Sequence, residues 1–274
     1  SARVLARARC RERAVWSVRI GGAFMANVLT ALSAGMQSVV AALYPPQCAL
    51  CSEPTEANFG LCAACWRETR FVEGALCDSC GTGLTGEAAG GERLYCDDCL
   101  AHERPWSRGR AALAYAGGGR KLVLALKTGD RTEIARVVAP LLARAGRPLL
   151  RPDTLIVPIP LHWSRRMGRR YNQAALLALA LGRQSGIPVC PDALVRTRRT
   201  RPLDFPDREA RFALLDGAIA ANATRAGALR RRPILLVDDV MTSGATFNAA
   251  TRACYAAGAS EVCILALARA AKDA

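Results

Sequence analysis

Three features are missing from this chain of 274 residues: a clear secretory signal, an uninterrupted apolar run long enough to cross a membrane, and the phosphate motif G-x-x-x-x-G-K-[ST]. The first two absences argue against a secreted or membrane-spanning protein. The third argues against a P-loop nucleotide hydrolase. A run of three glycines at 117–119 is interpreted as a turn, because consecutive glycines are a common turn signal.

The first 46 residues contain a basic segment followed by a predicted helix. Residues 1–24 carry six arginines against one glutamate, and we expect a disordered or misassigned extension, with initiation at Met25. A targeting-like or polyanion-binding arm is the alternative. Residues 25–46 predict a packing helix that ends at two prolines, because apolar side chains recur there at helical spacing with polar residues between them.

Cysteine is abundant, and eight of the twelve cysteines form four C-x-x-C pairs within residues 47–102. Zinc prefers four thiolates from two such pairs, so the spacing predicts a double zinc ribbon with two structural zinc ions. Disulfides are disfavoured because zinc-spaced cysteines without a secretory signal indicate a reducing compartment, the cytoplasm. Sequential pairing is expected, although the shorter first spacing leaves an interleaved arrangement open. The sequential sets are Cys48, Cys51, Cys62 and Cys65, and Cys77, Cys80, Cys96 and Cys99.

The charge is strongly basic, with 38 lysines and arginines against 23 acidic residues and a net charge of +15. Such a field attracts polyanions, and arginine binds phosphate through two hydrogen bonds, so nucleotides or nucleic acid are candidate partners. The alternative is an arginine-rich composition without a specific role.

Residues 105–270 alternate between predicted strands and helices, which indicates an α/β domain. A strand is expected at 109–115 and helices at 120–127 and 132–145. From residue 154 the order is strand, helix, strand, long polar loop, strand, helix and strand. This alternation predicts a parallel sheet with helices on its faces.

Residues 234–246 read as a buried strand, two carboxylates, a loop of small hydroxyl residues and a helix that begins near Ala245. Such a loop lies at the carboxyl end of a parallel strand, where open α/β sheets bind ligands. Backbone N–H groups at the helix start attract phosphate, whereas Asp238 and Asp239 suit sugar hydroxyls or Mg²⁺. The segment therefore predicts a ribose 5-phosphate ligand, with the phosphate held by Thr242, Ser243, Gly244, Ala245 and Thr246.

A second basic loop follows the strand predicted at 155–160. It includes Arg169 and Arg170, and it should open on the same edge of the sheet as the Asp238 loop. We therefore interpret it as a second anion site; a solvated basic turn is the alternative.

Together these motifs resemble two known groups of proteins. Residues 234–246 resemble the phosphoribosyl pyrophosphate (PRPP) signature of type I phosphoribosyltransferases. The C-x-x-C pairs, the Pro-Ile-Pro segment, the Arg-Arg-Tyr-Asn-Gln segment and Val-Asp-Asp-Val-x-Thr-Ser-Gly-x-Thr resemble the ComF family. That resemblance implies a double zinc ribbon followed by a type I phosphoribosyltransferase-like domain.

The resemblance also implies roles for single residues. Asp238 and Asp239 would hold the ribose hydroxyls and Mg²⁺, and the loop with Arg169 and Arg170 would face the pyrophosphate. Lys127 matches a recurrent lysine upstream of the core. Residues 196–211 occupy the place of a mobile loop that closes over substrate, but Leu203 stands where glutamine is common.

Two functions follow from these patterns. The first is a Mg²⁺-dependent phosphoribosyltransferase that uses PRPP, with an acceptor that no segment identifies. The alternative is a non-catalytic protein that binds PRPP or a related nucleotide and single-stranded DNA, with bases stacked on Trp163 and Tyr171. The resemblance associates either function with DNA uptake in natural transformation. The ribbons would be a structural staple or a docking module for a competence-machinery protein.

Overall fold

The computed structural model describes residues 45–56, 58–86, 92–128, 131–161, 171–198 and 208–270. A five-stranded sheet with the order β1-β2-β7-β6-β3 forms its centre. The last four strands in this order are parallel, and β1 joins β2 antiparallel at the edge. The predicted α/β fold is confirmed. The strands are β1 (Thr69–Phe71), β2 (Arg108–Ala116), β3 (Leu155–Pro158), β6 (Pro233–Met241) and β7 (Glu261–Arg269).

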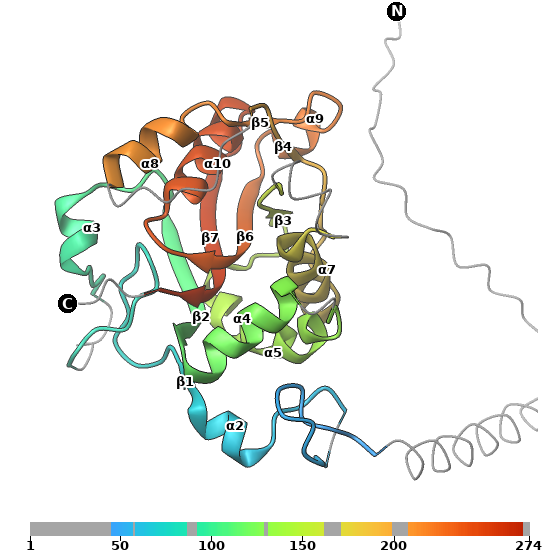
Figure 1. Cartoon of the computed structure of the whole chain (residues 1–274). Coiled ribbons are helices and arrows are strands. Elements are labelled where there is room, and N and C mark those ends of the chain that lie inside the picture. Colours follow the sequence, from blue (N-terminus) through green and yellow to red (C-terminus); the bar gives the residue numbers. More distant parts are fainter. Residues whose placement is uncertain are drawn as a thin grey trace, which may run out of the picture.

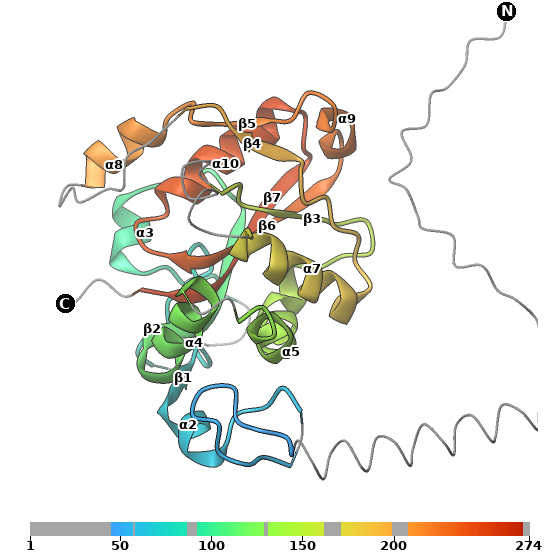
Figure 2. The same ribbon diagram turned by 45° about the vertical axis from the view of Figure 1, so that its right-hand side comes forward.

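Helices cover both faces of this sheet (Figures 1 and 2). Successive side chains of a strand point to opposite faces, so Ile234 and Leu236 of β6 pack in one core and Leu235 and Val237 in the other. The first core lies under α10 (Ala245–Ala256). The second lies under α4 (Gly117–Thr128), α5 (Ile134–Gly146) and α7 (Gln173–Ser185).

Shorter elements complete the described fold. The strands β4 (Leu194–Arg196) and β5 (Ile219–Ala221) form a separate antiparallel pair next to α10, and α8 (Arg208–Leu215) and α9 (Ala226–Leu229) are short helices of the same part of the chain. The cysteine-rich segment contributes α2 (Ala63–Glu68), β1 and α3 (Asp97–Ala101), and the 3₁₀ helix η1 (Arg147–Leu149) follows α5. The helix predicted at 25–46 lies outside the described residues up to residue 44, as does the extension at 1–24.

The glycine run at 117–119 is the first turn of α4, so its interpretation as a turn between elements was wrong. Tertiary packing explains the glycines. A Cβ atom on Gly117 would lie 2.4 Å from the carbonyl oxygen of Glu68, and one on Gly118 would lie 2.1 Å from Oγ1 of Thr69. Helix α4 therefore approaches the end of α2 and the start of β1 more closely than any side chain allows.

The third C-x-x-C pair, Cys77 and Cys80, packs directly on β2. Oδ1 of Asp78 accepts hydrogen bonds from Arg108 (3.1 Å) and Arg110 (2.5 Å). A Cβ atom on Gly109 would lie 2.3 Å from the carbonyl oxygen of Ser79. The ribbon is thus joined to the sheet by charge pairs and by close backbone packing.

One further motif lies in this part of the chain. Residues 81–86 have the spacing G-x-G-x-x-G, but they lie in the second cysteine cluster and not between a strand and a helix, so the context of a dinucleotide site is missing.

Among the residues that the structure describes, no helix is both long and apolar enough to cross a bilayer.

Candidate functional site

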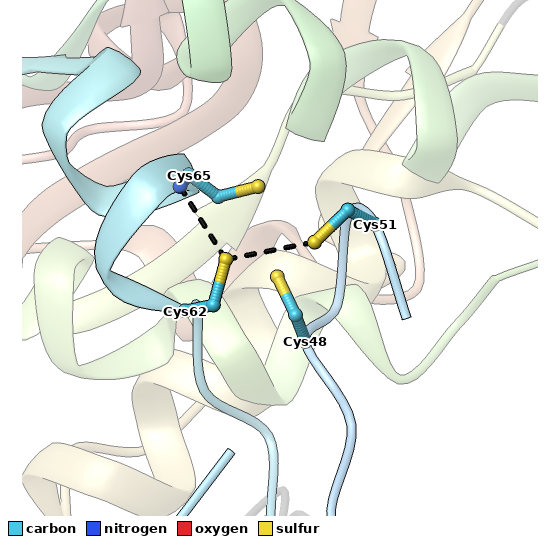
Figure 3. A group of neighbouring side chains, drawn as sticks. All are labelled: Cys48, Cys51, Cys62 and Cys65. Atoms are coloured by element: carbon cyan, nitrogen blue, oxygen red, sulfur yellow. Dashed lines mark hydrogen bonds between the residues drawn. The ribbon is translucent and has the colours of Figure 1, made fainter. Parts of the chain in front are cut away.

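The eight paired cysteines form two clusters, each of which joins two C-x-x-C pairs that are consecutive in sequence. Within each cluster the sulfur atoms lie within 4.8 Å of one another. Sγ of Cys51 lies 3.5 Å from Sγ of Cys62 (Figure 3), and Sγ of Cys80 lies 3.7 Å from Sγ of Cys96. These distances are close to the edge of about 3.8 Å expected for four sulfurs around one zinc ion. The donor sets fit structural zinc, and the sequential pairing is confirmed.

The two clusters differ in exposure. Cys51 of the first cluster is exposed, whereas Cys77 and Cys80 of the second are fully buried in the core under α10. Hydrogen bonds from the thiols of Cys77 and Cys99, together with the charge of Arg269, lower the pKa of Cys80. The second cluster is therefore shielded from solvent and lies next to the domain that carries the phosphate loop.

The predicted phosphate loop lies between β6 and α10. Helix α10 begins at Ala245, as predicted, and Gly244 at its N-cap has a left-handed backbone (φ 84°) that favours glycine. The first N–H groups of a helix have no partner within the helix and can bind an anion. A cavity of about 270 Å³ opens here, lined by Arg211, Leu215, Asp238, Val240, Met241, Thr242, Ser243, Gly244, Ala245, Thr246 and Phe247.

The two carboxylates were predicted to end the strand, but β6 runs two residues beyond them, because it continues to pair with β7 as far as Met241. Strand β3 stops earlier, with Pro158 opposite Val237. The edge of β6 is thus uncovered by β3 from Asp238 onward. Because neighbouring residues of a strand point to opposite faces, Asp238 and Asp239 have different surroundings.

Asp238 lines the cavity, whereas Asp239 pairs with Lys127 of α4, with 3.2 Å between Nζ and Oδ1. Burial and the charge of Asp239 raise the pKa of Asp238 to about 7, although Lys127 and Arg196 oppose the shift. In the cavity, Asp238 offers a carboxylate to sugar hydroxyls or to one coordination position of Mg²⁺, whereas the carboxylate of Asp239 is taken up by Lys127.

Residues 162–170 of the second basic loop, which include Trp163, Arg169 and Arg170, lie outside the described residues. So do residues 199–207, which include Leu203. The described flank has a structural role. Tyr171 donates a hydrogen bond to the carbonyl of Leu126 (3.1 Å), and Asn172 caps α7 by accepting from the N–H of Ala174 (3.1 Å). These contacts tie the start of α7 to the end of α4.

Sequence reasoning missed two arginines at the site, Arg104 and Arg269. Arg211 of α8 lines the cavity, and it is the last residue of the stretch 196–211 that the resemblance placed next to the substrate. Arg269, at the end of β7, donates to the carbonyl oxygens of Thr242 (2.7 Å) and Met241 (3.1 Å). Arg104 donates to the carbonyl oxygen of Ser243 (2.9 Å). Arg104 and Arg269 are nearly fully buried, which no pattern in the sequence indicates.

Comparison with known proteins gives relatives over most of the chain. Residues 39–100 match the double zinc ribbon domain. The chain is 33% identical over 233 residues to the DNA utilization protein YhgH of Escherichia coli K12, across 82% of this chain and 97% of that protein. It is 31% identical over 222 residues to Competence protein F of Haemophilus influenzae, across 78% and 92%. The match to a solved structure, the hypoxanthine-guanine phosphoribosyl transferase of Leishmania donovani, covers 54% of this chain and 71% of that chain at 17% identity, with a TM-score of 0.30.

Zinc release from the fully loaded protein should occur in two phases. The first cluster exposes Cys51 and should lose its ion rapidly to a chromogenic chelator, whereas the buried second cluster should release slowly. The variant Cys51→Ser should remove the fast phase and keep the slow one. A single phase in the wild type, or loss of the slow phase in this variant, would contradict the assignment.

The raised pKa of Asp238 makes the protein less stable as pH rises. The folded state keeps the proton up to about pH 7, whereas the unfolded state releases it at the ordinary carboxyl value, so this contribution is present at low pH and lost through pH 7. In magnesium-free buffer, Asp238→Asn should gain about 2 kcal/mol of unfolding free energy over the wild type between pH 5 and pH 8. Parallel stability curves for the two proteins, measured by urea denaturation, would refute the shift.

Proposed function

Because the chain belongs to the ComF family of double zinc ribbon proteins, we propose that it binds PRPP and acts as a Mg²⁺-dependent phosphoribosyltransferase. One observation carries the proposal. A hydroxyl-rich loop at a helix N-terminus, a carboxylate and an arginine line a single cavity at the carboxyl end of β6. The loop suits a phosphate, and the carboxylate suits the hydroxyl groups of the attached sugar.

Each group at the cavity has a proposed role in binding PRPP. Residues 242–246 wrap the 5-phosphate with backbone N–H groups and hydroxyls, and Arg211 adds positive charge from α8. Asp238 accepts hydrogen bonds from the ribose. Asp239, held by Lys127, supports the same end of β6. When bound, Mg²⁺ would supply charge stabilisation for the phosphate oxygens.

In the proposed reaction, a nucleophile of the acceptor forms a bond to C1 of the ribose. The bond between C1 and the pyrophosphate oxygen breaks, and pyrophosphate leaves with the electron pair. Arg169 and Arg170 offset its charge. The protein contributes mainly position and electrostatic stabilisation. The cytoplasm fits this role, because zinc thiolates need a reducing compartment.

Calorimetric titration of the zinc-loaded protein with PRPP tests the site. Binding should require Mg²⁺ and should weaken at least about tenfold in Asp238→Asn, the loss expected for one hydrogen bond to a charged group. Asp239→Asn should slow pyrophosphate release from PRPP, because the ion pair with Lys127 that supports this end of β6 is lost. The control is Asp153→Asn, which removes the same charge from an exposed position before β3. Equal binding by Asp238→Asn and the control would reject the site.

A second candidate function is binding of single-stranded DNA. The net charge of +15 supports it, as do the names of two relatives, which refer to DNA utilization and competence. Arginines would contact phosphates, and Tyr171 at the start of α7 would offer a ring for base stacking. In this function the nucleotide site would serve recognition without turnover.

The salt dependence of the affinity for DNA shows whether this binding is electrostatic. The affinity for a fluorescent oligothymidylate should fall steeply between 50 and 200 mM NaCl, because each phosphate contact releases a counterion. Competition by PRPP with Mg²⁺ would place the DNA at the same cavity. An affinity that barely changes with salt would exclude the electrostatic mode of binding.

A further inference from the structure

Arg104 joins the second cysteine cluster to the phosphate loop. Its side chain is only 2% exposed, and its two terminal nitrogens bind in opposite directions. Nη2 lies 2.5 Å from Oδ2 of Asp98, which stands between the cluster ligands Cys96 and Cys99. Nη1 donates to the carbonyl oxygen of Ser243 at 2.9 Å. One guanidinium therefore contacts both a cysteine knuckle and the loop.

Trp106 makes a second connection from the other knuckle of the same cluster. Its indole Nε1 donates to the carbonyl oxygen of Ser79, which stands between Cys77 and Cys80, at 2.5 Å. Its ring packs on the loop so closely that a Cβ atom on Gly244 would lie 3.1 Å from it. Arg104 also lies over this ring, 5.6 Å from its centroid.

The contacts that Arg104 and Trp106 make with the loop depend on an intact second cluster. A nearly buried guanidinium is stable only while its charge is paired, and Asp98 is the carboxylate that pairs it. The positions of Asp98 and Ser79 depend on the four cysteines that enclose them. Loss of the ion from this cluster would release both anchors, and with them the contacts to residues 243 and 244.

We propose that Arg104 is a positioning residue through which zinc at the second cluster controls the shape of the phosphate loop. The ion fixes both knuckles, the knuckles fix Arg104 and Trp106, and these hold the loop ready for an anion. The first cluster contacts a different element, α4, through the ion pair between Glu68 and Lys121 (2.6 Å). The identity of the anion rests on the proposed function, but the mechanical connection does not.

Hydrogen exchange of the zinc-loaded full chain tests the connection without a ligand. In Arg104→Met, the amides of residues 242–246 should exchange at least about tenfold faster than in the wild type, because a charge-assisted hydrogen bond to the loop is lost. The matched control is Arg108→Met, which removes an arginine that pairs with Asp78 of the same cluster. Its loop should exchange at the wild-type rate. Equal loop exchange in Arg104→Met and the control overturns the proposal.

A milder variant covers the case in which Arg104→Met fails to fold. Trp106→Phe keeps an aromatic side chain but lacks both the Nε1 donor to Ser79 and the distal ring atom Cη2 that lies nearest to Gly244. It should accelerate exchange of the same amides, while its zinc content and circular dichroism match the wild type. Unchanged loop exchange in a folded Trp106→Phe contradicts the proposal.

If zinc at the second cluster favours binding of PRPP, PRPP must favour binding of zinc by the same factor, because linkage between two binding equilibria is reciprocal. In an equilibrium competition titration with a chelator, saturating PRPP with Mg²⁺ should raise the zinc affinity of the second cluster about fivefold and leave that of the first cluster unchanged, and Arg104→Met should abolish this gain. If PRPP does not bind the wild type, the proposed function fails and the exchange experiment still decides the role of Arg104. If PRPP binds without raising the zinc affinity of the second cluster, the coupling is refuted and the proposed function stands.

Discussion

The hydrogen bonds that buried arginines donate to the carbonyl oxygens of residues 241–243 are the interaction on which the candidate site depends. A loop that presents its N–H groups to an anion must satisfy its carbonyl groups elsewhere, because unpaired buried backbone groups are costly. Arg269 binds the carbonyls of Met241 and Thr242, and Arg104 binds that of Ser243. Both also place positive charge beneath the loop, which favours an anion above it.

The two zinc ribbons contact different parts of the α/β domain. The second reaches the phosphate loop through Arg104 and Trp106. The first lies against α4, where the close approach of Gly118 to Thr69 leaves no room for a side chain. Helix α4 in turn carries Lys127, the partner of Asp239. The ribbons therefore act on the site through packing, and the proposed chemistry belongs to the sheet and its loops.

Local patterns in the sequence were enough to predict the zinc clusters, the parallel sheet and the start of α10, because each depends on residues close together in the chain. Features set by distant residues were not predictable. The length of β6 is determined by its pairing with β7, so the carboxylates lie inside the strand. The glycines at 117–119 serve a contact with Glu68 and Thr69, and Arg104 contacts a residue 139 positions away. The predicted roles of Arg169, Arg170 and the loop residues stay predictions.

A crystal structure of the zinc-loaded protein with PRPP and Mg²⁺ tests the central claim most directly. The 5-phosphate should lie against the N–H groups of residues 244–246, with the ribose beside Asp238 and with Arg104 still bound to Ser243 and Asp98. Density for the phosphate at another surface, or an ordered loop from which Arg104 has withdrawn, would contradict it.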